Sequence, residues 1–143
     1  MYVPDLAPFP FPGLGESHCV LAVGWLDAEH PFPTAPPSER FVRRLFAFSR
    51  VLVRGTRGFH LCEMCGGPVE MMQETRDGVT LHLGSAEVWI YGRGVAFRAP
   101  NLVYHYVVRH EYAPPEAFVN AACAWWQPLA QRRHRAPNLK ELP

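Results

Sequence analysis

The sequence lacks any apolar run close to the roughly 20 residues that a helix needs to cross a bilayer. Its first 18 residues, MYVPDLAPFPFPGLGESH, are interrupted by prolines and contain acidic residues, so they are not a secretory signal. These absences predict a cytoplasmic protein with no membrane partner. Thiols stay reduced in that compartment, so the four cysteines are expected to be ligands or buried thiols rather than disulfides.

Lysine is also nearly absent, since Lys140 is the single example, and the formal net charge is only +1. Such a charge gives little long-range attraction for nucleic acid or acidic lipid. Arginines nevertheless cluster between Arg40 and Arg57 and in the RRHR stretch at 132–135. We expect the first cluster to be a solvated helix face, with a docking patch for an acidic protein or a nucleic acid as the alternative.

Familiar catalytic motifs are missing too: the chain has no GxSxG, GxxxxGK[ST], GxGxxG or HExxH. Glu63 and Glu87 are acids, but each is expected to be a solvated turn or strand residue. We therefore predict no catalytic residue. The tandem Trp125-Trp126 is a candidate for contact with a protein partner, because both rings cannot point inward from one helix.

Turn and apolar patterns predict an α+β fold, a small antiparallel β-meander packed by about three helices. A chain of 143 residues fits one domain. The expected division is a Pro-rich N-terminal arm over residues 1–18, a single α+β domain over 19–127 and a polar tail over 128–143. The arm is expected to be extended over the surface or disordered.

The predicted strands include CVLAVGW at 19–25, which begins at a Cys19 expected to be buried. Two further pairs of strands flank the hairpin signals Asp77-Gly78 and Gly92-Arg93-Gly94. One helix is predicted over about 38–52, with Ser38 as its cap. A second helix is predicted to have Pro100 in its first turn and to end near residue 110, and a third is predicted to follow Pro114-Pro115.

The most informative stretch is GFHLCEMCGG, at 58–67, in which Cys62 and Cys65 are two residues apart and two glycines follow. A CxxC turn brings two sulfurs to one point, and the glycines let backbone amides turn toward them, as in a zinc knuckle. The second ligand pair is predicted to be His105 and His110. On an ideal helix their rings lie about 140° apart, so a tightened or unwound last turn is needed.

Several alternatives to a Cys62, Cys65, His105 and His110 zinc site stay open. A redox dithiol is less favoured because Gly66-Gly67-Pro68 is a poor helix start. Two buried thiols with no metal are the plainer interpretation. In a third interpretation, His60 either supports one of the ligands by a hydrogen bond or replaces one of the histidines as a ligand. Cys123 is expected to be a buried helix residue.

Several segments together resemble an uncharacterised family of small bacterial proteins. They are VGWLDAEHPFPT at 23–34, RGFHLCEMCG at 57–66, and the long stretch at 83–121 that contains APNLVYHYVVRHEYAPPEAF. The resemblance covers most of residues 20–122 and leaves out the N-terminal prolines and the tail after Trp126. It implies that these motifs belong together, and it implies no activity.

The resulting hypothesis is a structural Cys2His2 zinc site in a non-catalytic module that binds another macromolecule, most plausibly a protein. One alternative is a metal-dependent, hydrolase-like enzyme with an open coordination position. Another is a nucleic-acid binder that uses the Arg-rich helix. A shell of four protein ligands favours the first, because it leaves no position for a substrate or water.

Overall fold

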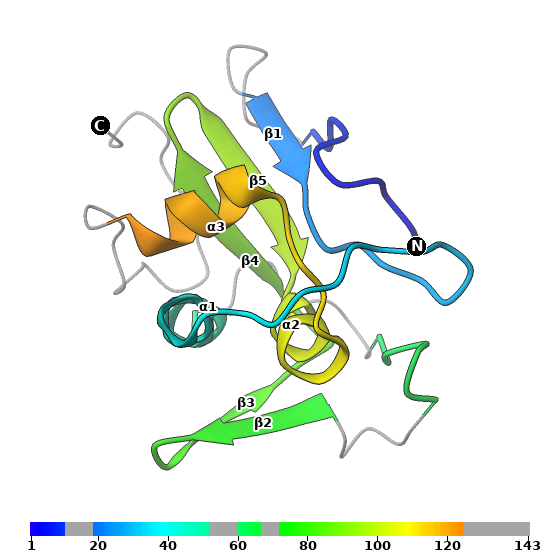
Figure 1. The fold of residues 1–143 in the computed structure, drawn as a ribbon, viewed down its shortest axis with the longest axis vertical. Coiled ribbons are helices and arrows are strands. Elements are labelled where there is room, and N and C mark those ends of the chain that lie inside the picture. Colours follow the sequence, from blue (N-terminus) through cyan, green and yellow to red (C-terminus); the bar gives the residue numbers. More distant parts are fainter. Residues whose placement is uncertain (11–18, 52–59, 67–71, 125–143) are drawn as a thin grey trace.

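Two separate β-sheets make up the β structure of the computed structural model, which describes residues 1–10, 19–51, 60–66 and 72–124 (Figure 1). In the larger sheet, β5 (Val95–Pro100) lies between β1 (Cys19–Ala22), which is parallel to it, and β4 (Glu87–Gly92), which is antiparallel. The smaller sheet is an antiparallel hairpin of β2 (Gln73–Arg76) and β3 (Val79–His82). The α+β class is therefore confirmed.

The predicted antiparallel meander is only partly right. Both hairpins form as predicted, and Asp77 and Gly78 have φ angles of 51° and 79°, as a type I′ turn requires. The chain leaves the small hairpin after β3, however, and does not pair β3 with β4. The free edge of β5 is taken by β1, whose Val20 and Ala22 are buried there. A long-range parallel pairing thus replaces the next step of the meander.

The described residues form three helices, α1 (Glu39–Ser49), α2 (Val103–His110) and α3 (Glu116–Cys123). Helices α1 and α3 pack on β4 of the larger sheet, and α1 also packs against α2 and α3. Ser38 caps α1 as predicted, since its hydroxyl accepts a hydrogen bond from the Phe41 N–H at 3.1 Å. The helix ends at Ser49, short of the expected 52. Pro100 was wrongly placed in the first turn of α2. It ends β5 instead, and the helix begins three residues later.

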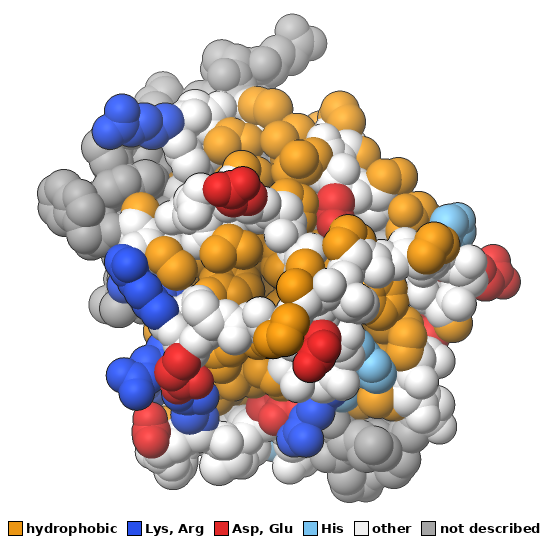
Figure 2. Space-filling model, in the orientation of Figure 1, with side chains coloured by type: hydrophobic (Ala, Val, Ile, Leu, Met, Phe, Trp, Pro, Cys, Tyr) orange, Lys and Arg blue, Asp and Glu red, His pale blue; other side chains and the backbone are white. Residues whose placement is uncertain are grey.

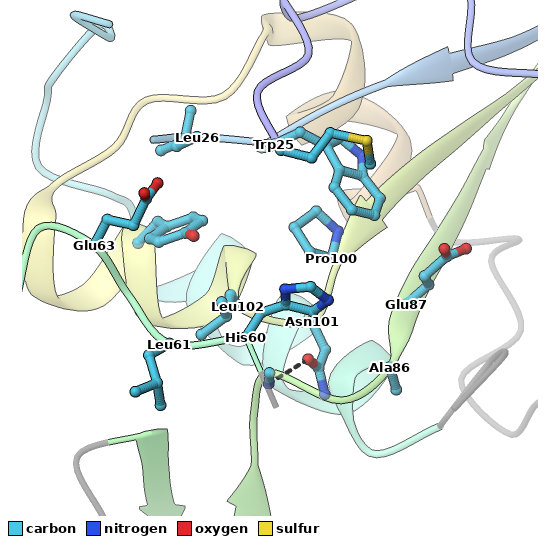
Figure 3. Close-up of a pocket in the computed structure, with 13 residues that line it drawn as sticks. Trp25, Leu26, His60, Leu61, Glu63, Ala86, Glu87, Pro100, Asn101 and Leu102 are labelled. Carbon is cyan, nitrogen blue, oxygen red and sulfur yellow. Dashed lines mark hydrogen bonds between the residues drawn. The ribbon is translucent and has the colours of Figure 1, made fainter. Parts of the chain in front are cut away.

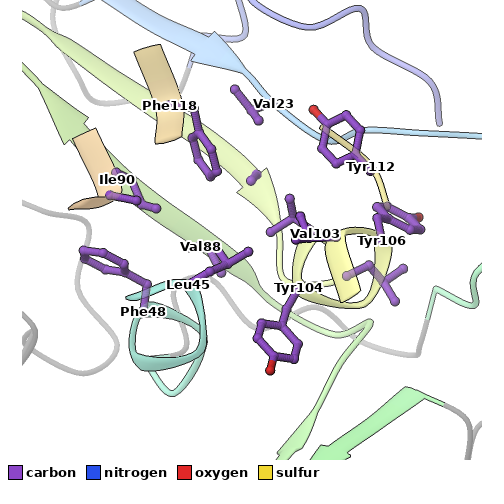
Figure 4. Packing of buried hydrophobic residues seen from close by; sticks show 14 of the residues in the cluster. Val23, Leu45, Phe48, Val88, Ile90, Val103, Tyr104, Tyr106, Tyr112 and Phe118 are labelled. Carbon is purple, nitrogen blue, oxygen red and sulfur yellow. The ribbon is translucent and has the colours of Figure 1, made fainter. Parts of the chain in front are cut away.

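The core lies between the helices and the larger sheet (Figure 4). Leu45 and Phe48 of α1, Ile90 of β4 and Phe118 of α3 are almost completely buried. Tyr104 and Tyr106 are also core residues, as the apolar face of α2 predicts. Apolar burial of this kind is the main stabilising contribution in a domain of this size.

The first ten residues extend over the surface along β1, which is the first of the two expected arrangements. The N–H groups of Leu6 and Phe9 donate to the carbonyls of Ala22 and Val20, at 2.7 and 2.9 Å. The carboxylate of Asp5 accepts hydrogen bonds from the Gly24 N–H and the Tyr112 hydroxyl. Cys19, by contrast, is exposed, which corrects the expectation that it is buried.

Two arginines of α1, Arg40 and Arg44, bind the end of α3. The guanidinium of Arg44 donates to the carbonyls of Ala122 and Ala124, at 2.7 and 2.8 Å, and that of Arg40 donates to the carbonyl of Cys123. These side chains bind the C-terminal end of α3, where helix carbonyls lack backbone partners and carry partial negative charge. Figure 2 shows arginine side chains on the side of the molecule where α1 lies.

Among the described helices, none combines the length and the apolar character that crossing a membrane requires. The predictions for Trp125-Trp126, for RRHR and for the tail at 128–143 concern residues outside those described.

Candidate metal centre

Residues 60–66 form a short turn that is anchored to the rest of the chain at its start and closed by a hydrogen bond of its own. At its start, the His60 N–H donates to the Gly84 carbonyl at 2.7 Å. Within it, the Gly66 N–H donates to the Cys62 carbonyl at 3.2 Å, which closes the CxxC turn, and Gly66 has a φ of +59° that favours glycine. The turn therefore directs both sulfurs toward α2.

The end of α2 explains how His105 and His110 converge despite their five-residue separation. The N–H groups of Glu111 and Tyr112 both donate to the carbonyl of Tyr106, so the last turn contains an i→i−5 hydrogen bond of the π type. Glu111 then adopts a left-handed conformation that ends the helix. The widened turn places the two imidazole centroids 5.1 Å apart. The unwound last turn expected from the sequence is thus present.

The four predicted side chains meet at one point. The Nε2 atoms of His105 and His110 lie 3.2 Å from the Cys65 sulfur, and the His110 Nε2 lies 3.3 Å from the Cys62 sulfur. All four donor atoms lie within 4.8 Å of one another. A tetrahedral zinc ion, with Zn–S of about 2.3 Å and Zn–N of about 2.0–2.1 Å, requires donors about 3.3–3.8 Å apart. The arrangement is compatible with a metal site after small adjustments.

Burial sets the chemistry of these donors. Cys62 and His105 are almost completely buried, whereas Cys65 and His110 are half-buried. Burial, with the neighbouring Cys65 thiol, raises the pKa of Cys62 to about 11, and burial, with the neighbouring His110, lowers the pKa of His105. The neutral imidazole is the form that ligates a metal, and a bound cation would stabilise the thiolates.

One acidic residue beside the cluster was missed by the sequence analysis. Glu74 of β2 is buried, and its carboxylate binds the Arg109 guanidinium through two contacts of 2.8 and 3.2 Å. The same carboxylate lies 3.8 Å from Nδ1 of His105, the ring nitrogen turned away from the sulfurs. Thirty-five residues separate Glu74 from Arg109, so no local spacing pattern could have indicated this pair.

The other candidate residues lie outside the cluster. His60 is exposed, Cys123 is a half-buried residue at the end of α3, and neither belongs to the Cys/His group. Glu63 is an exposed turn residue, as expected. Glu87 is not solvated as expected: it is buried, it forms an ion pair with Arg98 at 2.8 Å, and it accepts a hydrogen bond from the Trp89 indole.

A cavity of about 440 Å³ opens beside the CxxC turn (Figure 3). His60, Leu61 and Glu63 of the turn form one side of it, and Trp25 and Pro100 lie across from them. None of the four clustered cysteines and histidines lines this cavity. The candidate metal centre and the cavity are therefore neighbours that share one segment of chain.

Comparisons with known proteins assign the chain to a family whose function is not known. A search of curated proteins and a search of solved structures each found no match. The family model described as a domain of unknown function, DUF7919, matches residues 1–123. The match begins at the first residue, so it includes the Pro-rich arm that the earlier resemblance left out. The chain belongs to this uncharacterised family, DUF7919.

Proposed function

We propose that Cys62, Cys65, His105 and His110 bind one structural zinc ion, and that the domain is a non-catalytic binding module built around it. The observation that carries the proposal is the convergence of two thiols and two imidazoles from segments 40 residues apart. This donor set is the one that tetrahedral structural zinc prefers. Its members come from a short turn and from helix α2, which the proposed ion would hold together.

The carboxylate beside His105 supports the same proposal. Histidines that ligate zinc through one ring nitrogen commonly donate the other N–H to a carboxylate. Nδ1 of His105 is buried and has no hydrogen-bond partner among the described residues, and the nearby Glu74 carboxylate lies just beyond hydrogen-bond distance. A shift of less than 1 Å would complete the bond. Zinc at Nε2 would fix the proton on the nitrogen that faces Glu74.

Two further observations support a structural role over the alternatives. Four protein donors fill a tetrahedral shell, and none of them lines the cavity, so a substrate there would not reach the ion directly. The nucleic-acid alternative loses part of its basis, because Arg40 and Arg44 are engaged with the carbonyls of α3. That the partner is a protein stays a prediction.

Metal analysis of purified protein tests the proposal. We expect about one zinc per chain, tightly held, as structural sites show. Cys65→Ser should lose most of the zinc, and Cys123→Ser is the matched control, because Cys123 is also half-buried but lies outside the cluster. Protein with less than about 0.2 zinc per chain and four free thiols would contradict the proposal. Equal zinc loss in the two variants would contradict the assignment of Cys65.

A further inference from the structure

The cavity beside the CxxC turn has the size and the lining of a small-molecule site. Its volume of about 440 Å³ lies in the range of roughly 300–1,000 Å³ that is typical of ligand pockets. Most of its lining is apolar or aromatic, and few polar groups face it. The residues come from distant parts of the chain: Met1, Trp25, Leu26, His60, Leu61, Glu63, Gly84, Ala86, Glu87, Pro100, Asn101, Leu102 and Tyr106.

The charged side chains of the described lining are acidic. Two carboxylates, Glu63 and Glu87, line the cavity, no lysine or arginine is among the described lining residues, and the amino group of Met1 is the one cationic terminus there. Glu87 is compensated by Arg98, which holds it through two contacts of 2.9 and 2.8 Å. Glu63 forms no ion pair among the described residues and is exposed. The Glu63 carboxylate at the opening therefore has no ion-pair partner within 4.0 Å among the described residues.

Besides His60 and Tyr106, the remaining polar side chains of the described lining are already in use. The Trp25 indole N–H donates to the Arg98 carbonyl, and the Asn101 side chain binds the Gly84 N–H and the His82 carbonyl. These bonds fix the walls and leave aromatic and aliphatic surface facing the space. Such a site favours a ligand with an apolar body and one positive charge, because a cation is attracted both to the carboxylate and to the faces of aromatic rings.

We propose that this cavity binds a small organic cation, an amine or guanidine on an apolar body, with Glu63 as its counter-ion. The inference rests on the proposed zinc site in one respect: the metal centre holds the wall that carries Glu63. That wall is the segment 60–66, which is anchored by the His60–Gly84 backbone bond at one end and by Cys62 and Cys65 within it.

Gly84 shows how closely this wall is seated. A Cβ atom at Gly84 would collide with the carbonyl oxygen of His60, and its φ of +104° also disfavours any other residue. The backbone anchor holds only the start of the wall. Release of the metal would free the cysteine end, move Glu63 and Leu61, and lower the affinity for the cation.

The test is a titration of the full chain, followed by amide NMR, with phenethylamine as the probe. Two molecules of similar shape are the controls: 2-phenylethanol, which is neutral, and 3-phenylpropionate, which is an anion. We expect phenethylamine to shift the amides of Leu26, Leu61 and Leu102 saturably. We expect phenethylamine to bind about fivefold more tightly than 2-phenylethanol, which is the gain that a partly exposed ion pair provides. We expect 3-phenylpropionate to bind more weakly than the alcohol. Equal affinity for amine and alcohol would overturn the inference.

Variants separate the charge from the apolar contact. Glu63→Gln should reduce the affinity for phenethylamine about fivefold and leave that for 2-phenylethanol unchanged. Glu116→Gln, on the exposed start of α3 and outside the cavity, is the matched control and should change neither. Leu61→Ser should weaken both ligands. Zinc content is measured in each variant, so that a loss of metal is not mistaken for a loss of the counter-ion.

Titrations of the protein with and without zinc distinguish the two proposals. If zinc is bound and chelation lowers the amine affinity about tenfold or more, the coupling is supported. Zinc-loaded protein that does not bind the amine would overturn the cation site and leave the zinc site standing. Metal-free purified protein that binds the amine saturably would overturn the zinc site and the coupling, while the pocket itself would stand.

Discussion

Two regions of the molecule are stabilised in different ways. The sheet region, which comprises β1, β4, β5, α1 and α3, is built on apolar side chains such as Leu45, Ile90 and Phe118, each with 0% exposure. The cysteine region comprises residues 60–66, the β2–β3 hairpin and the last turn of α2. It depends more on polar contacts, namely the four donors and the Glu74–Arg109 pair. If the proposed zinc site is right, the first region is stable through burial alone, whereas the second depends on the ion as well.

The largest effect is expected from a change inside the sheet region. Phe118 is completely buried and its ring packs edge-on against Phe41 and Phe97, with centroids 6.2 and 5.8 Å away. Phe118→Ala should lower the free energy of unfolding by about 3–5 kcal/mol, because it leaves a cavity in a packed core. Urea denaturation measures the loss. Asn120→Ala, at an exposed position of the same helix, is the control, and a loss below about 1 kcal/mol would contradict the assignment of the core.

Chelation should affect the cysteine region alone. With the ion removed, we expect amide hydrogen exchange to accelerate about a hundredfold at residues 60–66 and 105–112, because the donors no longer hold these segments together. Amides of β4 and β5 should keep their protection. Uniform acceleration over the whole chain would show that the two regions unfold as one unit, which would remove the contrast between them.

Glu74→Gln should weaken zinc binding by about 10- to 100-fold, the usual cost of losing a carboxylate that orients a ligating histidine. The charge of Glu74 lies 3.8 Å from Nδ1 of His105, where it favours the tautomer that presents Nε2 to the ion. Competition with a chelating dye measures the affinity. Glu39→Gln is the matched control, because Glu39 also pairs with arginines but lies away from the cluster. Equal zinc affinity in the two variants would show that Glu74 pairs with Arg109 and does not support His105.

The smallest effect is expected at the start of α1, in the sheet region. Ser38→Ala should cost about 1 kcal/mol of unfolding free energy, because the N–H of Phe41 loses its side-chain acceptor. Ser38→Asp should retain the stability, since aspartate is an equally good cap. Thermal unfolding of the zinc-loaded protein measures both. If Asp and Ala are equally destabilising, the hydroxyl of Ser38 acts through something other than capping.

Local patterns in the sequence predicted the parts that depend on neighbouring residues. The CxxC turn, the I′ hairpin at Asp77-Gly78 and the Ser38 cap all follow from spacing and residue type over a few positions. The convergence of His105 and His110 required one further assumption about the helix end, which the π-type bond satisfies. The CxxC turn and the end of α2 are each formed by contacts between nearby residues, even though Cys65 and His105 are 40 residues apart.

Features that depend on distant pairing were not predictable in this way. The parallel placement of β1 beside β5 joins residues more than 70 apart, and no turn signal encodes it. Burial of Glu87 depends on Arg98 from the neighbouring strand, and that of Glu74 on Arg109 from a helix. The local sequence around each glutamate predicts a solvated side chain, because the arginine partner is identified only once the strands and helices are packed.

The arginines of α1 have a consequence for the order in which the chain folds. They donate to carbonyls at the end of α3 that lie 78 to 83 residues later in the sequence. A helix of eight residues is marginal by itself in water. On a ribosome, α1 emerges well before α3, so the partner for those carbonyls already exists when they appear. The third helix is thus completed by an element synthesised far earlier, and its formation marks the closure of the whole domain.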